Sequence, residues 1–234
     1  MDVALENPVR TATPLTRIQK LIGRRMMFSK QTKPCIYLES QVDVTELMRL
    51  RPKLRKSLGI RITSNTFFIH ALALAAAKFP IVLGAIRGEY VKIADSINVG
   101  FAVNTAQGLV VPVIKHADTK SLSEIAREED ALTQKARSNK LTLDEIENET
   151  IALSNLGVYG TDSFFGIVPP PATTILAIGN VIRTAVPEGS ETVPRKIMSL
   201  TSAADRRIVS EACAAEFFSY LRQLLDNPEQ LTLM

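Results

Sequence analysis

Five polar side chains lie within seven positions near the end of the chain: Asp205, Arg206, Arg207, Ser210 and Glu211. Carboxylates and guanidiniums at this spacing form ion pairs, or hold an anion by paired hydrogen bonds. A guanidinium cannot act as a general base, because it has no lone pair to accept a proton and stays charged above about pH 12. The string therefore has three interpretations: an active site, an ion-paired corner between a strand and a helix, or an active site that has lost its chemistry.

The histidines and cysteines do not predict a metal site. There are two of each, His70 and His116 and Cys35 and Cys213, with no CxxC pair, whereas a structural zinc site needs about four ligands. The cysteines are expected to be reduced, buried thiols. His70 lies in a segment that is apolar nearly all round and is expected to be a packed core residue. The sequence contains no GxGxxG, P-loop, HExxH or GxSxG pattern.

The composition is that of an ordinary globular protein, with 46% hydrophobic residues, 22% charged residues and a net charge of +4. With no Trp and 6% aromatic residues, the sequence lacks the mixture of aromatic and basic residues typical of RNA readout, and a small anionic ligand suits the charge equally well. No apolar run reaches the roughly 18 residues of a membrane span, and the first residues resemble neither a signal nor a transit peptide. We therefore expect an intracellular chain, or a piece of a longer one, without nucleic-acid or membrane partners.

Periodicity predicts helices and strands in alternation. Residues 1–12 are polar and aperiodic and are interpreted as a tail or linker, followed by one domain over residues 13–234. Helices are expected over residues 13–32, 45–58, 64–79, 121–139, 141–148 and 211–231, with Thr13 capping the first and Ser121 the fourth. Strands are expected over residues 35–44, 80–86, 90–103, 109–116, 150–160, 169–186 and 195–205. This order predicts an α/β or α+β two-layer sandwich of helices on a sheet.

Several strings, in their order along the chain, resemble one family. They are RRMMFSKQTKP, DVTELMRLR, INVGFAVNTAQGLVVPVIKHADTKSLSEIARE, SNLGVYGTDSFFGIVPPPATTILAIGNV and DRRIVSEACAAEFFSYLRQLLDNPEQL. From Pro14 to Met234 the chain resembles the catalytic core domain of the dihydrolipoamide acyltransferase component of 2-oxoacid dehydrogenase complexes. The resemblance implies a chloramphenicol-acetyltransferase-like fold, a mixed sheet covered by helices, and a trimer with active sites between subunits. It also implies acyl transfer from a lipoyl thioester to coenzyme A.

Acyl transfer of this kind needs a base and a hydrogen-bond donor. A neutral imidazole takes the proton of a thiol whose pKa is near about 8.5, and the donor stabilises the oxyanion of the tetrahedral intermediate. In the resembled family a serine of the SNLG string is the donor, which places that role at Ser154. The alternative for Ser154 is a strand-end serine bonded to the backbone.

The base of the resembled family belongs to a His-Arg-x-x-Asp-Gly string preceded by Asp. In register with it, Arg206 occupies the histidine position, Ser210 the aspartate position and Glu211 the glycine position. Arg206 follows Ser154 by 52 positions, the spacing that the resemblance implies, and no slip by one residue restores a histidine. Losing a general base typically lowers a rate about 10²–10⁴-fold, so the resemblance implies an impaired active site.

Two further departures accompany this loss. In the resembled family the aspartate is thought to pair with an arginine of the first helix, here Arg24 or Arg25, and Ser210 supplies no carboxylate for it. Glu211 is a candidate replacement. Cys35 stands where a histidine commonly follows the proline of that strand entry.

Three hypotheses stay open. In the first, the chain is a non-catalytic core subunit that forms homotrimers and co-assembles with an active homologue. In the second, it is an enzyme with altered chemistry in which Arg206 and Arg207 hold a carboxylate or phosphate. In the third, it is a module that binds CoA or acyl-CoA without turnover. An apolar tail of Leu231, Leu233 and Met234 packs either on its own domain or on a neighbouring trimer of a larger cage. The expected compartment is the cytoplasm, or the mitochondrial matrix for a eukaryotic chain.

Overall fold

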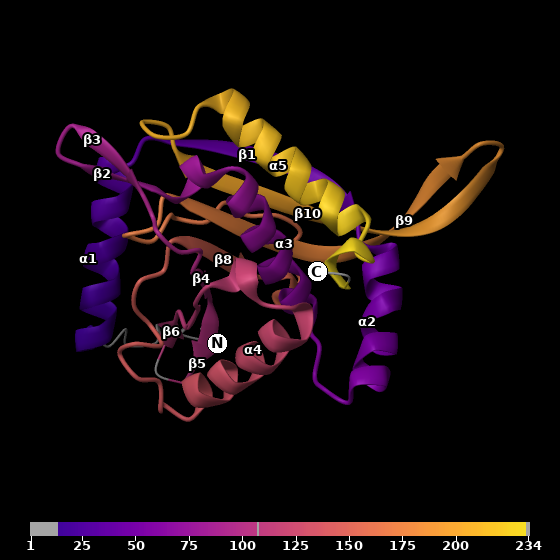
Figure 1. The fold of residues 1–234 in the computed structure, drawn as a ribbon, viewed down its shortest axis with the longest axis horizontal. Helices are drawn as coiled ribbons and strands as arrows, with labels where there is room; N and C mark the ends of the chain where they lie inside the picture. The colour runs from indigo at the N-terminus through magenta and orange to yellow at the C-terminus, as the bar shows by residue number, and fades with distance from the viewer. Residues whose placement is uncertain (1–13, 107, 233–234) are drawn as a thin grey trace, which may run out of the picture.

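A six-stranded mixed sheet runs through the centre of the protein in a computed structural model that describes residues 14–106 and 108–232 (Figure 1). Only the pairs β4–β8 and β8–β9 are parallel, and the remaining pairs are antiparallel. The order across the sheet is β1 (Cys35–Asp43), β10 (Glu191–Asp205), β9 (Thr174–Glu188), β8 (Ile151–Asn155), β4 (Val99–Phe101) and β7 (Val113–Ile114). Two hairpins stand apart from it: β2 (Gly84–Arg87) with β3 (Tyr90–Ile93), and β5 (Val103–Thr105) with β6 (Gly108–Val110).

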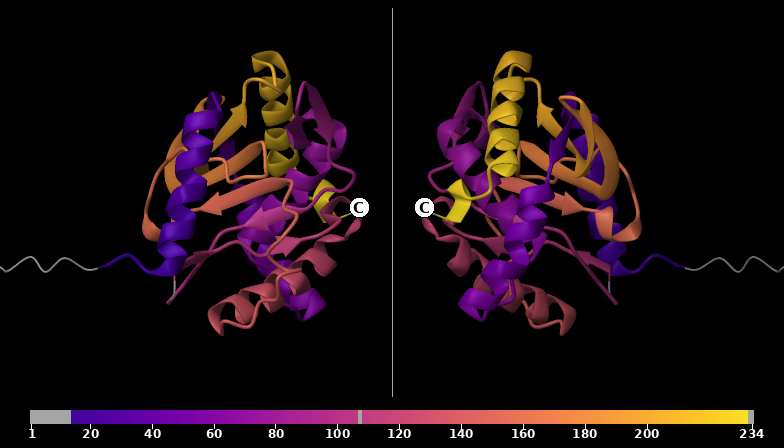
Figure 2. Two further views of the ribbon diagram at one scale, coloured as in Figure 1. Left: turned by 90° about the vertical axis from the view of Figure 1, so that its left-hand side faces the viewer. Right: turned by 90° about the vertical axis from the view of Figure 1, so that its right-hand side faces the viewer.

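The helices lie on both faces of the sheet (Figures 1 and 2). On one face are α3 (Ser64–Lys78) and α5 (Glu211–Asp226), flanked by α2 (Thr45–Leu58) and α4 (Leu122–Arg137); α1 (Arg17–Thr32) lies on the other. The main core fills the space between the sheet and the first group, where burying apolar area contributes roughly 25 cal/mol per Å². It includes Phe67, Leu72, Leu176, Phe217 and Leu221. The predicted sandwich of helices on a mixed sheet is confirmed.

The face of the sheet that bears α1 is thinly covered. Its small core consists of Ala152, Val168, Ala172, Ile175 and Ala203, with Cys35 packed against it. Several large apolar side chains on α1 remain exposed, namely Leu21, Met27 and Phe28. This side of the molecule therefore leaves apolar surface in contact with solvent.

Local hydrogen bonds explain where some elements differ from the prediction. Helix α1 begins at Arg17, because Thr16 forms the capping box with Gln19; Thr13 lies outside the described residues. Residues 141–148 form turns instead of a helix, residues 80–83 form a 3₁₀ turn, and the predicted strand 90–103 is interrupted twice. The capping box of Ser121 is confirmed.

The remaining expectations concern single residues and the chain ends. His70 is buried in α3, as expected. Cys35 and Cys213 are free thiols, but they are only half-buried. Leu231 packs into the core of its own chain, whereas the expected tail over residues 1–12 and the two last residues lie outside the described part. Within the described residues, no helix is both long and apolar enough to cross a membrane, and no group of three His, Cys, Asp or Glu side chains is placed to hold a metal ion.

Candidate functional site

The strand register places Ser154 and Arg206 at different ends of the sheet. Ser154 in β8 pairs with Ala177 of β9, which in turn pairs with Thr201 of β10. Arg206 follows Thr201 by five residues, and a strand rises about 3.3 Å per residue, so the two positions are separated by roughly 16 Å along the strands. Within one chain the candidate donor and the candidate base position therefore do not meet.

Ser154 lines a cavity of about 520 Å³ between β8, α4 and the start of α3. The hydroxyl of Ser154 forms no hydrogen bond with any other described residue, so the alternative of a backbone-bonded serine is wrong. Its neighbour Asn155 fixes the string in place, because its side chain donates to Asn65 Oδ1 at 2.7 Å and accepts from Gly157 N at 2.9 Å. The hydroxyl thus stays available as a donor in a rigid setting.

The same cavity combines apolar, amide and charged groups. Phe101, Val103 and Leu109 contribute apolar wall, and two guanidiniums, Arg61 and Arg137, stand beside it. Arg61 pairs with Asp130 at 2.9 Å. Glu129 and Asp130 also line the cavity, so its wall carries two carboxylates beside the two guanidiniums.

The corner at Arg206 is a closed set of ion pairs. Arg206 Nε donates to Glu211 Oε1 at 2.5 Å, and this hydrogen bond holds the pKa of Glu211 below its usual value. Arg207 binds Asp205 in a bidentate manner, through Nε at 3.0 Å and a terminal nitrogen at 2.6 Å. Asp205 is buried, whereas both guanidiniums are half-exposed. The two arginines therefore already hold carboxylates of their own chain.

Ser210 performs a structural task in this corner. It is the N-cap of α5, and its hydroxyl accepts a hydrogen bond from Cys213 N at 3.3 Å. A serine at this position satisfies one of the free N–H groups of the first helical turn. Position 210 is thus joined to the helix backbone and, in the part of the chain that the structure describes, to no arginine.

The arginine of α1 has a different carboxylate from the one expected. Arg25 donates to the carbonyl of Pro170 and lies 3.8 Å from Glu149 Oε1. Glu211 binds Arg206 instead, so the expectation that Glu211 replaces the missing carboxylate for Arg24 or Arg25 is wrong. The physical reason is proximity: Glu211 follows directly after the turn that carries Arg206, whereas Glu149 is buried beneath α1.

Glu149 is a buried charged residue near Arg25 that was not predicted from the sequence. Only 6% exposed, it lies against Gly100, and its Oε2 atom has no hydrogen-bond partner among the described residues. Burial raises its pKa to about 7, although Arg25 and Lys33 oppose this rise. In the sequence it belongs to the polar string ENET, which carries no periodic signal.

Cys35 is placed beside this corner but is not an activated thiol. It pairs with Asp205 across β1 and β10. Burial and the nearby carboxylate of Asp205 raise the pKa of the Cys35 thiol, so it stays protonated at neutral pH. It therefore supplies neither a base nor a thiolate nucleophile.

Comparison with known proteins places this geometry in a family. The model of the 2-oxoacid dehydrogenases acyltransferase (catalytic domain) matches residues 7–233. The dihydrolipoyllysine-residue acetyltransferase component of the pyruvate dehydrogenase complex of Rickettsia bellii is 32% identical over 94% of this chain and 54% of its own length. The chain thus spans about half the length of the curated relatives it matches.

Solved structures agree in fold. The dihydrolipoamide acetyltransferase of Azotobacter vinelandii is 29% identical with a TM-score of 0.89, over 94% of this chain and 93% of that one. The cubic core of a pyruvate dehydrogenase multienzyme complex is 29% identical with a TM-score of 0.90, and the match covers 99% of this chain and 97% of that one. A chloramphenicol acetyltransferase shares the fold at 14% identity, with a TM-score of 0.53, and the match covers 86% of this chain and 94% of that one. The chain belongs to the 2-oxoacid dehydrogenase acyltransferase (catalytic domain) family and has its chloramphenicol-acetyltransferase-like fold.

Proposed function

We propose that this chain is a catalytically impaired core subunit of a 2-oxoacid dehydrogenase-type complex, which keeps the acyltransferase scaffold and has lost the general base. The observation that carries the proposal is Arg206 in the base position, bound to Glu211. Its guanidinium has no lone pair with which to accept a thiol proton.

The spacing of the site supports the register on which this proposal depends. In the Azotobacter vinelandii enzyme, a serine, a histidine and an asparagine were investigated for their role in the catalytic mechanism, with the serine 52 positions before the histidine and the asparagine four after it. Ser154, Arg206 and Ser210 have the same two spacings. These equal spacings support taking Ser154 as the retained donor and Arg206 as the replacement of the base.

The homotrimer is part of the proposal. Ser154 and Arg206 lie roughly 16 Å apart in one chain, so a complete site would need Ser154 of one subunit and position 206 of another. The exposed apolar residues of α1 and the thin cover of that sheet face supply surface for such a contact. A larger cage, and co-assembly with an active homologue that provides the histidine, are extensions of this proposal.

A second candidate function is binding of CoA or acyl-CoA without turnover. The cavity at Ser154 supports it, since the hydroxyl bonds to no other described residue and Arg137 stands beside an apolar wall, although Arg61 is paired with Asp130 and Glu129 also lines the cavity. A third, acyl transfer with Arg206 and Arg207 holding an anion, has less support because Arg206 is already bound to Glu211 and neither guanidinium can accept a thiol proton.

The test is an acyl-transfer assay between acetyl-CoA and dihydrolipoamide. We expect a rate about 10²–10⁴-fold below that of an active homologue measured alongside, as for loss of a general base. A rate equal to the homologue's would refute the proposal. In the same preparations, a rise in melting temperature with CoA concentration would separate the binding module from a bare scaffold.

A further inference from the structure

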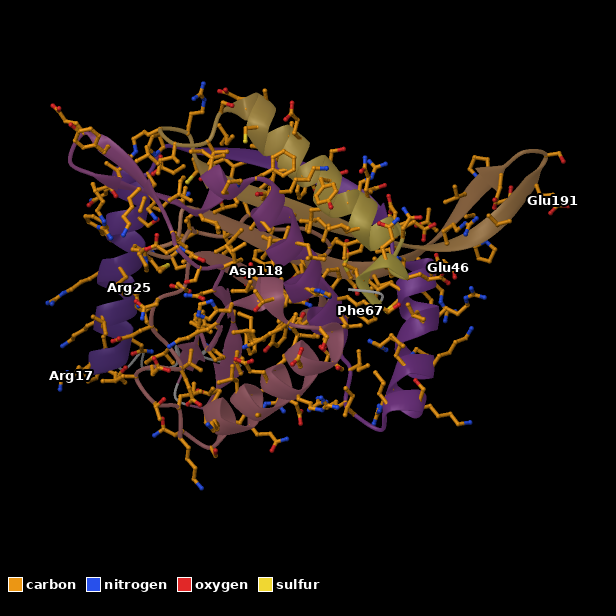
Figure 3. All side chains as sticks on the ribbon, in the orientation of Figure 1. Arg17, Arg25, Glu46, Phe67, Asp118 and Glu191 are labelled. Carbon is orange, nitrogen blue, oxygen red and sulfur yellow. The ribbon has the colours of Figure 1, made fainter. Side chains whose placement is uncertain are left out.

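A second cavity, distinct from the one at Ser154, lies where α1, the β2–β3 hairpin and the end of β10 come together. Its volume is about 580 Å³. In Figure 1 the hairpin lies beside one end of α1, and Figure 3 labels Arg17 and Arg25 along that helix, so the end next to the hairpin is the carboxyl end. Phe28 and Thr32 reach the cavity from that end.

The cavity holds more positive than negative charge. Three cations line it, Lys33, Arg87 and Arg207, against the single carboxylate of Asp205, which Arg207 already binds. Among the described residues, neither Lys33 nor Arg87 has a carboxylate within 4.0 Å. Two positive charges at this cavity therefore have no direct ionic partner.

Lys33 is the informative member of this set. It is half-buried, and its amino group donates to the carbonyl of Ala172, which fixes its position. Burial lowers the pKa of Lys33, since removing the ammonium from water is opposed only in part by Asp205 and Glu149. An anion in the cavity would offset this desolvation and would meet a group that is already positioned.

The rest of the wall is apolar except for Thr32 and Thr173, whose hydroxyls donate to the carbonyls of Phe28 and Gly84. Phe28, Ile86, Ile208 and the prolines at 170 and 171 form it. Arg207 is held in a fixed orientation by its two bonds to Asp205, which leaves its remaining N–H groups for an acceptor. Cations on one side and apolar groups on the other fit a small molecule with an oxyanion at one end and a few carbons at the other.

We propose that the cavity formed by Lys33, Arg87 and Arg207 binds a small organic oxyanion, a carboxylate or a phosphate monoester bearing a short apolar chain. The site uses neither Arg206 nor Ser154, so it does not depend on whether the chain transfers acyl groups. Carboxylate and phosphate share the chemistry that these cations recognise, and the probes separate them.

The experiment titrates the full chain with hexanoate, hexyl phosphate and inorganic phosphate, and with hexanol as the uncharged probe. Calorimetry measures the affinity of each ligand, and the melting temperature of the protein is measured at each ligand concentration. At least one of the two six-carbon anions, hexanoate or hexyl phosphate, is expected to bind more tightly than inorganic phosphate and hexanol. The anion with the higher affinity shows whether the site prefers a carboxylate or a phosphate. Equal effects of hexanol and both anions would mean a merely apolar cavity and would overturn the proposal.

Two variants assign the site. Arg87→Gln, an exposed change, is expected to weaken binding of the better anion about tenfold, as is Lys33→Met. The matched control Arg183→Gln removes an exposed arginine from β9 and is expected to leave the affinity unchanged. Affinity that survives Arg87→Gln and Lys33→Met, or that falls equally in Arg183→Gln, would locate the anion elsewhere. Neither result bears on the acyl-transfer assay, so the two proposals fail separately.

Discussion

At the scale of single residues, the corner after β10 is built from ion pairs and a helix cap. Arg206 binds Glu211, Ser210 caps α5, and Arg207 binds Asp205. Arg206, Arg207 and Ser210 thus each have a partner in the folded chain, and neither guanidinium has a lone pair that could accept a proton.

Restoring the proton acceptor tests this view. The triple variant Arg206→His, Ser210→Asp, Glu211→Gly is expected to transfer acetyl groups between acetyl-CoA and dihydrolipoamide at least about 100-fold faster than the parent, because an imidazole now accepts the thiol proton. Removal of Glu211 at the same time prevents it from binding the new side chain. Initial rates at matched protein concentration give the answer.

Ser154 provides the control for that gain. Adding Ser154→Ala to the triple variant is expected to lower the restored rate about 10²–10³-fold, as for the loss of one oxyanion donor. Undiminished activity would show that the donor is another group. A folded triple variant as slow as the parent would mean that more than the base has been lost.

At the scale of elements, α1 contacts the buried carboxylate of Glu149, whose pKa is raised. Arg25 reaches Glu149, and Ser29 donates to the carbonyl of Val168 at 2.6 Å. Since burial raises the pKa of Glu149 to about 7 from 4.5, its contribution to stability is complete below about pH 4.5 and is lost as the pH rises to about 7.

Glu149→Gln is therefore expected to remove this part of the pH dependence. Relative to the parent, the variant should gain up to about 3 kcal/mol in free energy of unfolding between pH 4.5 and pH 8. Urea denaturation of both proteins at several pH values measures it. Burial lowers the pKa of His70, which acts in the opposite direction, but His70 is common to both proteins and cancels in the difference. Parallel curves would contradict the role given to Glu149.

The segment after Ser154 is packed against β9 at glycines. A Cβ atom on Gly179 would collide with the carbonyl of Asp162, and one on Gly157 with the carbonyl of Gly179. Gly179→Ala is expected to lower the free energy of unfolding by more than about 2 kcal/mol, because backbone must move on both sides. Chemical denaturation at one pH is sufficient.

Gly23 in α1 is the matched control. A Cβ atom there has no described atom within 4 Å, and alanine has the higher helix propensity, so Gly23→Ala should raise the free energy of unfolding by about 0.5–1 kcal/mol. The opposite signs of the two Gly→Ala changes separate close packing from backbone entropy. Two changes of the same sign would contradict this explanation.

How much the sequence predicts depends on whether a signal is local. The cap at Ser121, the strands of the sheet and the buried α3 follow from periodicity and capping, which act within a few residues. The partner of Arg25 does not, because Glu149 lies 124 positions away in a polar string. The separation of Ser154 from Arg206 likewise depends on the register of three strands, which no single segment encodes.

At the scale of the whole molecule, the two faces of the sheet differ in how completely they are covered. The face bearing α3 and α5 is a continuous core, whereas the face bearing α1 has a core of five small or medium side chains and exposed apolar residues beside it. The same molecule holds its donor and its base position at separate ends. The proposed trimer accounts for both features, because a second and a third copy would cover the open face and would bring Ser154 of one chain to position 206 of the next.

Light scattering of the purified chain tests this arrangement. We expect a mass of three times 25.7 kDa, or a multiple of that trimer for a cage, since exposed apolar side chains gain about 25 cal/mol per Å² when covered. Placing charge on this surface by Leu21→Glu with Met27→Glu, at residues 59% and 61% exposed, should shift the mass toward a monomer without unfolding the chain. The control is Leu143→Glu, an equally apolar residue that is 71% exposed in a turn and should leave the mass unchanged. A monomeric mass for the parent would refute the trimer and with it the shared site. A mass of three chains would refute only the larger cage.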